Sequence, residues 1–122
     1  MKIDNRYRRD HEMAYFSDES VLAEQLVTKN AIREYNTVMP FETEKGMECL
    51  NRTGMKHGKN VYFEPPFHCE YGSHIEVGEN FYANTGCVML DVAKITIGKN
   101  VLFGPNVSIY TAGHPIHPES RN

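Results

Sequence analysis

Pairs of apolar residues, each split by one position, recur at regular steps along the second half of the chain. The step is six residues in most places and eight where the chain passes Glu70–Gly72 and Leu90–Val92. The pairs are Val61/Phe63, Phe67/Cys69, Ile75/Val77, Phe81/Ala83, Cys87/Met89, Ile95/Ile97, Val101/Phe103 and Val107/Ile109. Because alternate residues of a β-strand lie on one face, each pair predicts a short strand whose inner face is buried.

The same part of the chain also repeats a tripeptide every 20 residues. Its three copies are Gly58–Asn60, Gly78–Asn80 and Gly98–Asn100. Three short strands per period would close a triangle, and stacked triangles form a β-helix. An ordinary antiparallel sheet would explain the alternation but not the period, so we predict a parallel β-helix over residues 58–122. The corner residues expected in left-handed or tight conformations are Gly78, Asn84, Gly98 and Gly104.

Residues 1–57 have the spacing of helices instead. A first helix is predicted from Ser17 to Asn36, with Ser17 or Asp18 as its cap. The residues expected in its buried stripe are Leu22, Ala23, Leu26, Val27, Ala31, Ile32 and Tyr35. A second helix, from Glu42 to Asn51, is predicted to end before Gly54. The chain therefore divides into a helical region, 1–57, and a β-helix, 58–122.

The composition is typical of a globular protein without a strongly charged surface. The 122 residues are 40% hydrophobic and 24% charged, with a formal net charge of −3, so nothing favours nucleic acid or an anionic membrane as a partner. No apolar stretch approaches the ~20 residues of a membrane span, and the N-terminus lacks the apolar core of a signal peptide. A cytoplasmic protein is expected. The three cysteines form no CxxC pair, which argues against a disulfide framework.

One histidine near the end of the sequence has unusual neighbours. His114 lies between Gly113 and Pro115, so it must occupy an irregular turn. Asp91 lies about one coil earlier at an equivalent corner, and a carboxylate beside an imidazole raises the proton affinity that a general base needs. On these grounds alone, a plain turn histidine is the alternative.

A metal site built from His68, Cys69, His74 and Cys87 is a further alternative. The repeat turns both cysteines into the apolar interior, where they act as small hydrophobic residues. It directs the two histidines outward. We therefore predict no metal.

The run from Tyr71 to Asn122, with its segments FYAN, LD and TAGHP, resembles the maltose and galactoside O-acetyltransferases. These form the sugar branch of the hexapeptide-repeat acyltransferases, and the preceding EPPFHCEYG is similar to that branch as well. The resemblance begins at about Tyr15. It implies a left-handed parallel β-helix, a homotrimer with active sites between neighbouring chains, and acetyl-CoA as the donor of an acetyl group to a sugar hydroxyl.

Three residues of this chain match functional positions of that family. His114 matches its catalytic histidine, and Asn84 matches an acceptor-binding asparagine. Asp91 matches an acidic residue, which we expect to bind the acceptor or to balance the charge of the histidine. The resemblance identifies no acetyl-CoA-binding residue here.

Members of the family continue through several more coils, and those coils line most of the acetyl-CoA channel. We therefore expect the β-helix to be truncated at its C-terminal end and the 122-residue chain to bind acetyl-CoA weakly. The competing hypothesis is a non-catalytic solenoid that only assembles with itself or with another chain. Open β-helix ends favour such association because they expose strand edges.

Overall fold

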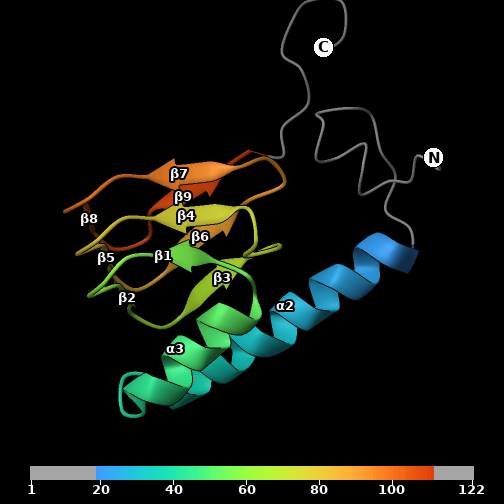
Figure 1. Cartoon of the computed structure of the whole chain (residues 1–122), viewed down its shortest axis with the longest axis horizontal. Helices are drawn as coiled ribbons and strands as arrows, with labels where there is room; N and C mark the ends of the chain where they lie inside the picture. Colours follow the sequence, from blue (N-terminus) through green and yellow to red (C-terminus); the bar gives the residue numbers. More distant parts are fainter. Residues whose placement is uncertain (1–18, 112–122) are drawn as a thin grey trace, which may run out of the picture.

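In the described part of the chain, nine short strands wind into three parallel sheets that form the sides of a prism (Figure 1). The computed structural model describes residues 19–111. The strands are β1 (Lys56–His57), β2 (Tyr62–Phe63), β3 (Phe67–Cys69), β4 (Ile75–Val77), β5 (Tyr82–Ala83), β6 (Cys87–Leu90), β7 (Ile95–Ile97), β8 (Leu102–Phe103) and β9 (Ser108–Tyr110). The sheets have the orders β1-β4-β7, β2-β5-β8 and β3-β6-β9.

Every strand pair joins residues that lie 20 apart in the sequence, for example Phe67 with Cys87 and Val88 with Ser108. This register confirms the predicted parallel β-helix, and the fold is consistent with the left-handed form that the family resemblance implies. The predicted division between residues 57 and 58 falls directly after β1, which already pairs with β4.

The predicted inner faces of the strands are buried. The inner positions at most 7% exposed are Val61, Phe63, Phe67, Cys69, Ile75, Val77, Phe81, Ala83, Cys87, Met89 and Ile95. The ring of Phe63 packs on Phe67 at a centroid distance of 4.2 Å and on Phe81 at 5.2 Å. In the last described coil, inner residues such as Phe103 and Ile109 are half-buried and pack against this core.

Two helices lie across one end of the prism (Figure 1). They are α2 (Glu19–Val38) and α3 (Thr43–Arg52), and they pack against each other and against the first coil. The predicted second helix is thus confirmed, and Gly54 follows it with a φ of 86°. The predicted caps Ser17 and Asp18 lie outside the described residues. Within residues 19–111, neither helix is long and apolar enough to cross a membrane.

The buried face of α2 differs from the predicted stripe. Leu22, Leu26 and Val27 are 51%, 60% and 61% exposed. The residues that α2 buries are Val21, Thr28, Ala31, Ile32, Tyr35 and Val38. The prediction was wrong for the first half of the helix because it counted only aliphatic spacing. Thr28 belongs to the buried face, since its hydroxyl donates a hydrogen bond to the carbonyl of Tyr71 at 2.8 Å.

Side chains of α2 bind the open backbone of the first coil. The Tyr35 hydroxyl donates to the carbonyl of Phe63 at 2.6 Å and accepts from its N–H at 3.0 Å. The Nδ2 group of Asn36 donates to the carbonyl of Phe67, and its Oδ1 accepts from the N–H of the same residue, both at 2.9 Å. Burial raises the pKa of Tyr35 to about 12, which keeps its hydroxyl protonated for this role. These contacts satisfy backbone groups that would otherwise form an unpaired sheet edge.

The left-handed corners are not the predicted ones. In the described residues, the non-glycine positions with positive φ are Asn60, Asn80, Asn100 and Asn106, at 58° to 62°. Gly78, Gly98, Gly104 and Asn84 are not among the positive-φ residues. Asparagine tolerates the left-handed region, and here it also stacks. The Nδ2 of Asn60 donates to Oδ1 of Asn80 at 3.1 Å, and Asn80 donates to Asn100 at 2.9 Å.

The glycine of the repeated tripeptide is required by the close approach of two coils rather than by its own φ. A Cβ atom placed on Gly78 would lie 2.7 Å from the carbonyl carbon and oxygen of Gly98. Gly58 meets the same obstacle, because its Cβ would lie 2.7 Å from the backbone nitrogen of Glu79. Around Gly98, by contrast, the described residues leave open space.

This difference provides a matched pair of substitutions. In the 122-residue chain, Gly78→Ala is expected to lower the free energy of unfolding by about 1–3 kcal/mol, because the methyl group overlaps backbone that cannot move aside. Gly98→Ala is expected to change it by less than about 0.5 kcal/mol. Urea unfolding followed by circular dichroism measures both. Equal losses for the two variants would contradict the close approach of the coils.

Candidate functional site

Asn84 follows β5 at the corner that leads to β6, and its side chain is half-buried. Its backbone N–H donates to the carbonyl of Phe103 at 3.1 Å, so the next coil holds it in place. The side-chain Oδ1 accepts from the N–H of Thr85 at 2.7 Å, which fixes the orientation of the amide. Within residues 19–111 its Nδ2 group has no hydrogen-bond partner, so the fixed amide offers a donor at this corner.

Asp91 follows β6 at the next corner, and it is fully buried at 0% exposure. Its Oδ1 accepts hydrogen bonds from the backbone N–H groups of Glu70 at 2.9 Å and of Tyr71 at 3.0 Å. Its Oδ2 accepts from the N–H of Gly72 at 2.8 Å. The carboxylate therefore faces the turn of the preceding coil, with three backbone donors around it.

His74 is part of the same corner, although the sequence predicted an outward position for it. The residue is half-buried. Its Nδ1 lies 2.6 Å from the carbonyl oxygen of Asp91, so this nitrogen must carry the proton and donate. The ring also packs on Tyr71 at a centroid distance of 5.0 Å. Sequence reasoning missed this role because the hexad pattern describes inner positions and says little about corners. His68, the other histidine predicted to face outward, is exposed.

His114 lies outside the described residues, so its expected proximity to Asp91 stays a prediction. The last described residue is Thr111, three positions earlier, and it pairs with the Asp91 corner from the coil above. Its N–H donates to the carbonyl of Leu90 at 3.1 Å, and its hydroxyl donates to the same oxygen. The N–H of Ala93 donates to Oγ1 of Thr111 at 3.0 Å.

Asn84 and Asp91 do not meet within one chain. They lie at opposite ends of β6, whose four residues span about 13 Å at the usual rise per residue. The two corners therefore face different edges of the prism.

The described residues hold no group of three or more His, Cys, Asp or Glu side chains that could bind a metal ion. The predicted absence of a metal stays a prediction. Cys69 and Cys87 point into the core, as predicted. Burial raises the pKa of Cys87 to about 11 and holds the pKa of Cys69 well above its usual value.

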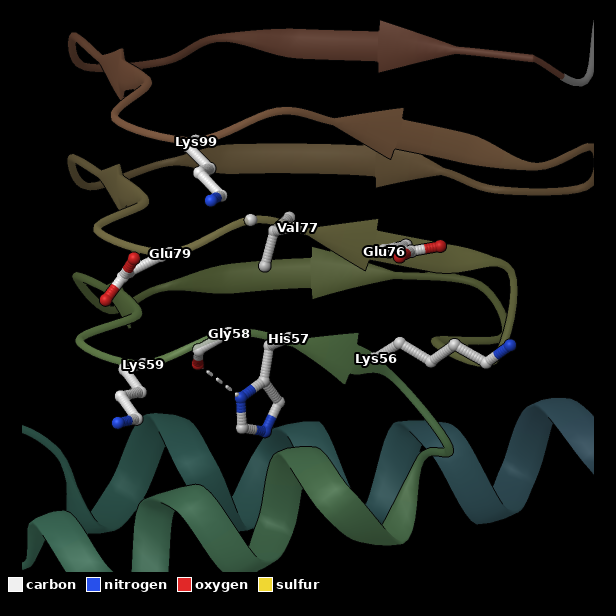
Figure 2. Close-up of a pocket in the computed structure, with 9 residues that line it drawn as sticks. Lys56, His57, Gly58, Lys59, Glu76, Val77, Glu79 and Lys99 are labelled. Carbon is white, nitrogen blue, oxygen red and sulfur yellow. Dashed lines mark hydrogen bonds between the residues drawn. The ribbon is translucent and has the colours of Figure 1, made fainter.

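An open groove of about 550 Å³ lies on the face formed by β1, β4 and β7 (Figure 2). It is lined by Lys56, His57, Gly58, Lys59, Glu76, Val77, Gly78, Glu79 and Lys99. Both ring nitrogens of His57 have partners, at 3.0 Å from the carbonyl of Gly58 and at 2.8 Å from Oδ1 of Asn51. Neither Asn84 nor Asp91 lines this groove. The groove is thus separate from the residues that the sequence singles out.

Comparison with known proteins gives a consistent result, although no family model matches the chain. The galactoside O-acetyltransferase of Escherichia coli K12 is 39% identical over 103 residues, which cover 84% of this chain and 51% of that protein. The chain thus spans about half the length of this curated relative.

Two solved structures superpose on nearly the whole chain. A maltose O-acetyltransferase from Clostridium difficile 630 has a TM-score of 0.86 and 39% identity, covering 96% of this chain and 63% of that one. A galactoside acetyltransferase in complex with coenzyme A has a TM-score of 0.82 and 33% identity, covering 97% of this chain and 60% of that one.

The raised pKa values of the buried thiols predict that the cysteines do not react in the folded chain. At pH 8, we expect a maleimide to label Cys69 and Cys87 only after denaturation, because both thiols are protonated and lie inside the prism. Mass spectrometry of the native and urea-treated chain measures the labelling. Labelling of Cys87 in the native chain within minutes would contradict its inward position.

Proposed function

Because this chain belongs to the maltose and galactoside O-acetyltransferase family of hexapeptide-repeat acetyltransferases, we propose that it carries the acceptor side of an enzyme that moves an acetyl group from acetyl-CoA to a sugar hydroxyl. The observation that carries this proposal is the superposition of 96% of the chain on a maltose O-acetyltransferase at a TM-score of 0.86. The coenzyme A in the related galactoside acetyltransferase structure supports acetyl-CoA as the donor.

In this proposal His114 is the general base. It accepts the proton of the sugar hydroxyl while the hydroxyl oxygen attacks the thioester carbonyl of the donor. It then returns this proton to the sulfur of the departing coenzyme A, so the residue ends the cycle as it began. No cysteine nucleophile takes part, which agrees with the buried, protonated thiols of Cys69 and Cys87. No metal is required for these steps.

Asn84 orients the acceptor. Its Oδ1 is already bound to the N–H of Thr85, so the direction of its Nδ2 donor is fixed before the sugar arrives. A fixed donor loses little conformational entropy on binding, and it holds the sugar hydroxyl where the base can reach it. We propose that Nδ2 donates to an oxygen of the sugar.

The predicted contact of Asp91 with the acceptor finds no support in the geometry of one chain. The side chain is fully buried, and both carboxylate oxygens accept hydrogen bonds from the turn of the coil below. We therefore assign the acceptor contact to Asn84.

We also propose the homotrimer that the family resemblance implies. Its support is the separation of the Asn84 corner from the corner of Asp91 and Thr111 by the length of β6. In a cyclic trimer, one corner of each prism can face the other corner of its neighbour. The active site then forms between chains. The cytoplasmic location expected from the sequence stays a prediction.

The trimer has a direct test. Multi-angle light scattering of the natural protein that contains this sequence is expected to give three times the mass of one chain at micromolar concentration. A monomer under these conditions would contradict a shared site.

The catalytic role of His114 is tested in the same natural protein. His114→Ala is expected to lower kcat about 10²–10⁴-fold, because a general base contributes that much to proton transfer. The matched control is His68→Ala, which removes an exposed histidine of β3 and is expected to leave kcat unchanged. The measurement is the release of coenzyme A thiol from acetyl-CoA in the presence of maltose or a galactoside. A His114→Ala enzyme within about twofold of the wild type would overturn the assignment. A wild-type protein that transfers no acetyl group would favour the assembly hypothesis instead.

A further inference from the structure

We infer that Asp91 is a positioning residue: its carboxylate locks the turn of the coil below, and its corner in turn holds Thr111 at the start of the segment that carries His114. The effect on catalysis through His114 rests on the proposed function. The hydrogen bonds between the Asp91 carboxylate and the turn at residues 70–72 do not depend on it. It assigns to Asp91 a role other than a contact with the sugar.

The first observation is the number and placement of the donors around the carboxylate. Three consecutive backbone N–H groups, those of residues 70–72, point at the two oxygens within 3.0 Å. Hydrogen bonds to a charged acceptor are stronger than those between neutral groups. A buried carboxylate with three such donors is well satisfied, and it ties one coil to the next.

The second observation is that the turn at 70–72 is attached to the helices. The carbonyl of Tyr71 accepts from the hydroxyl of Thr28, and its phenol oxygen accepts from Nε2 of Gln25 at 3.2 Å. Gly72 has a φ of 75°, and a Cβ atom there would lie 2.4 Å from that of Thr53. The turn is therefore packed between the helical region and Asp91 with little freedom to move.

The third observation is that the corner of Asp91 continues upward to Thr111. The backbone carbonyl of Asp91 accepts from Nδ1 of His74, which braces the corner from the side. One residue before Asp91 the carbonyl of Leu90 binds Thr111, and two residues after Asp91 the N–H of Ala93 does. Hydrogen bonds and the short backbone segment around Asp91 thus connect α2 to Thr111, three positions before His114.

A carboxylate is required here because its three hydrogen-bond partners among residues 19–111 are all donors. In Asp91→Asn, one oxygen becomes an NH₂ group, so at least one backbone N–H faces another donor and loses its bond. The size of the side chain hardly changes. This substitution therefore tests the hydrogen bonds rather than the packing.

The experiment is amide hydrogen exchange of wild type, Asp91→Asn and the control Glu76→Gln, which removes an exposed carboxylate of β4. In Asp91→Asn, exchange of the amides of residues 70–72 is expected to accelerate about tenfold or more relative to the amide of Glu64, which bonds to Ala83 in the backbone ladder. Glu76→Gln is expected to leave all of these rates unchanged. Unaltered exchange at residues 70–72 in Asp91→Asn would overturn the inference.

Kinetics of acetyl transfer in the natural protein separate positioning from binding. Positioning predicts that Asp91→Asn lowers kcat about tenfold or more while KM for the sugar stays within about threefold. A tenfold rise in KM with kcat unchanged would instead indicate a direct sugar contact and overturn the inference. If the wild type shows no transfer, the proposed function fails, and the exchange rates still decide whether Asp91 locks the turn.

A measurement on the wild type covers the case in which Asp91→Asn does not fold. Scalar couplings across hydrogen bonds connect the amide nitrogens of residues 70–72 to the carboxyl carbon of Asp91 in an isotope-labelled chain. All three couplings are expected. Their absence in a folded wild-type chain would overturn the inference without any variant.

Discussion

The backbone of each coil touches the backbone of the next, and the rest of the fold depends on this contact. The 20-residue register aligns each strand with the strand one coil later, so each corner stacks on an equivalent corner. At Gly78 the approach leaves no space for a Cβ atom. The same stacking brings Asn60, Asn80 and Asn100 into one ladder of side-chain hydrogen bonds. A change of one residue in the length of any coil would displace all these partners together.

Stacking also leaves backbone N–H and carbonyl groups of the first coil without a neighbouring strand. Side chains of α2 supply hydrogen bonds to these groups in place of a strand. Tyr35 and Asn36 each bind both the N–H and the carbonyl of one residue in the first coil. On the opposite corner, Thr28 binds the turn that Asp91 holds from above. The helical region is thus part of the architecture that positions the proposed site, although no residue of α2 is assigned a chemical step.

The sequence was sufficient to predict the features that repeat. Period, inner faces and strand positions follow from spacing alone, and the β-helix follows from them. The family was identified from the resemblance of particular segments, such as FYAN and TAGHP. Features that depend on a single contact were missed. The spacing of Leu22 and Leu26 predicted that they are buried. The helix instead buries the face that carries Thr28, whose hydroxyl donates to the carbonyl of Tyr71, and this leaves the two leucines exposed. Asn84 was expected in a left-handed corner, which the structure gives to Asn80 and Asn106 instead. Asp91 was expected to bind the acceptor or to balance the charge of His114. Its three backbone partners lie about 20 positions away in the sequence, and no local pattern signals them.

In the proposed site, Asn84 holds the sugar and His114 activates it, while the Asp91 carboxylate acts from inside the corner. A crystal structure of the natural protein with a bound maltose or galactoside tests this most directly. We expect an oxygen of the sugar within hydrogen-bond distance of Nδ2 of Asn84 and a hydroxyl about 3 Å from the imidazole of His114. We also expect the Asp91 carboxylate to keep its three backbone partners. A sugar bound away from both residues, or an Asp91 carboxylate turned toward the sugar, would contradict the proposed site.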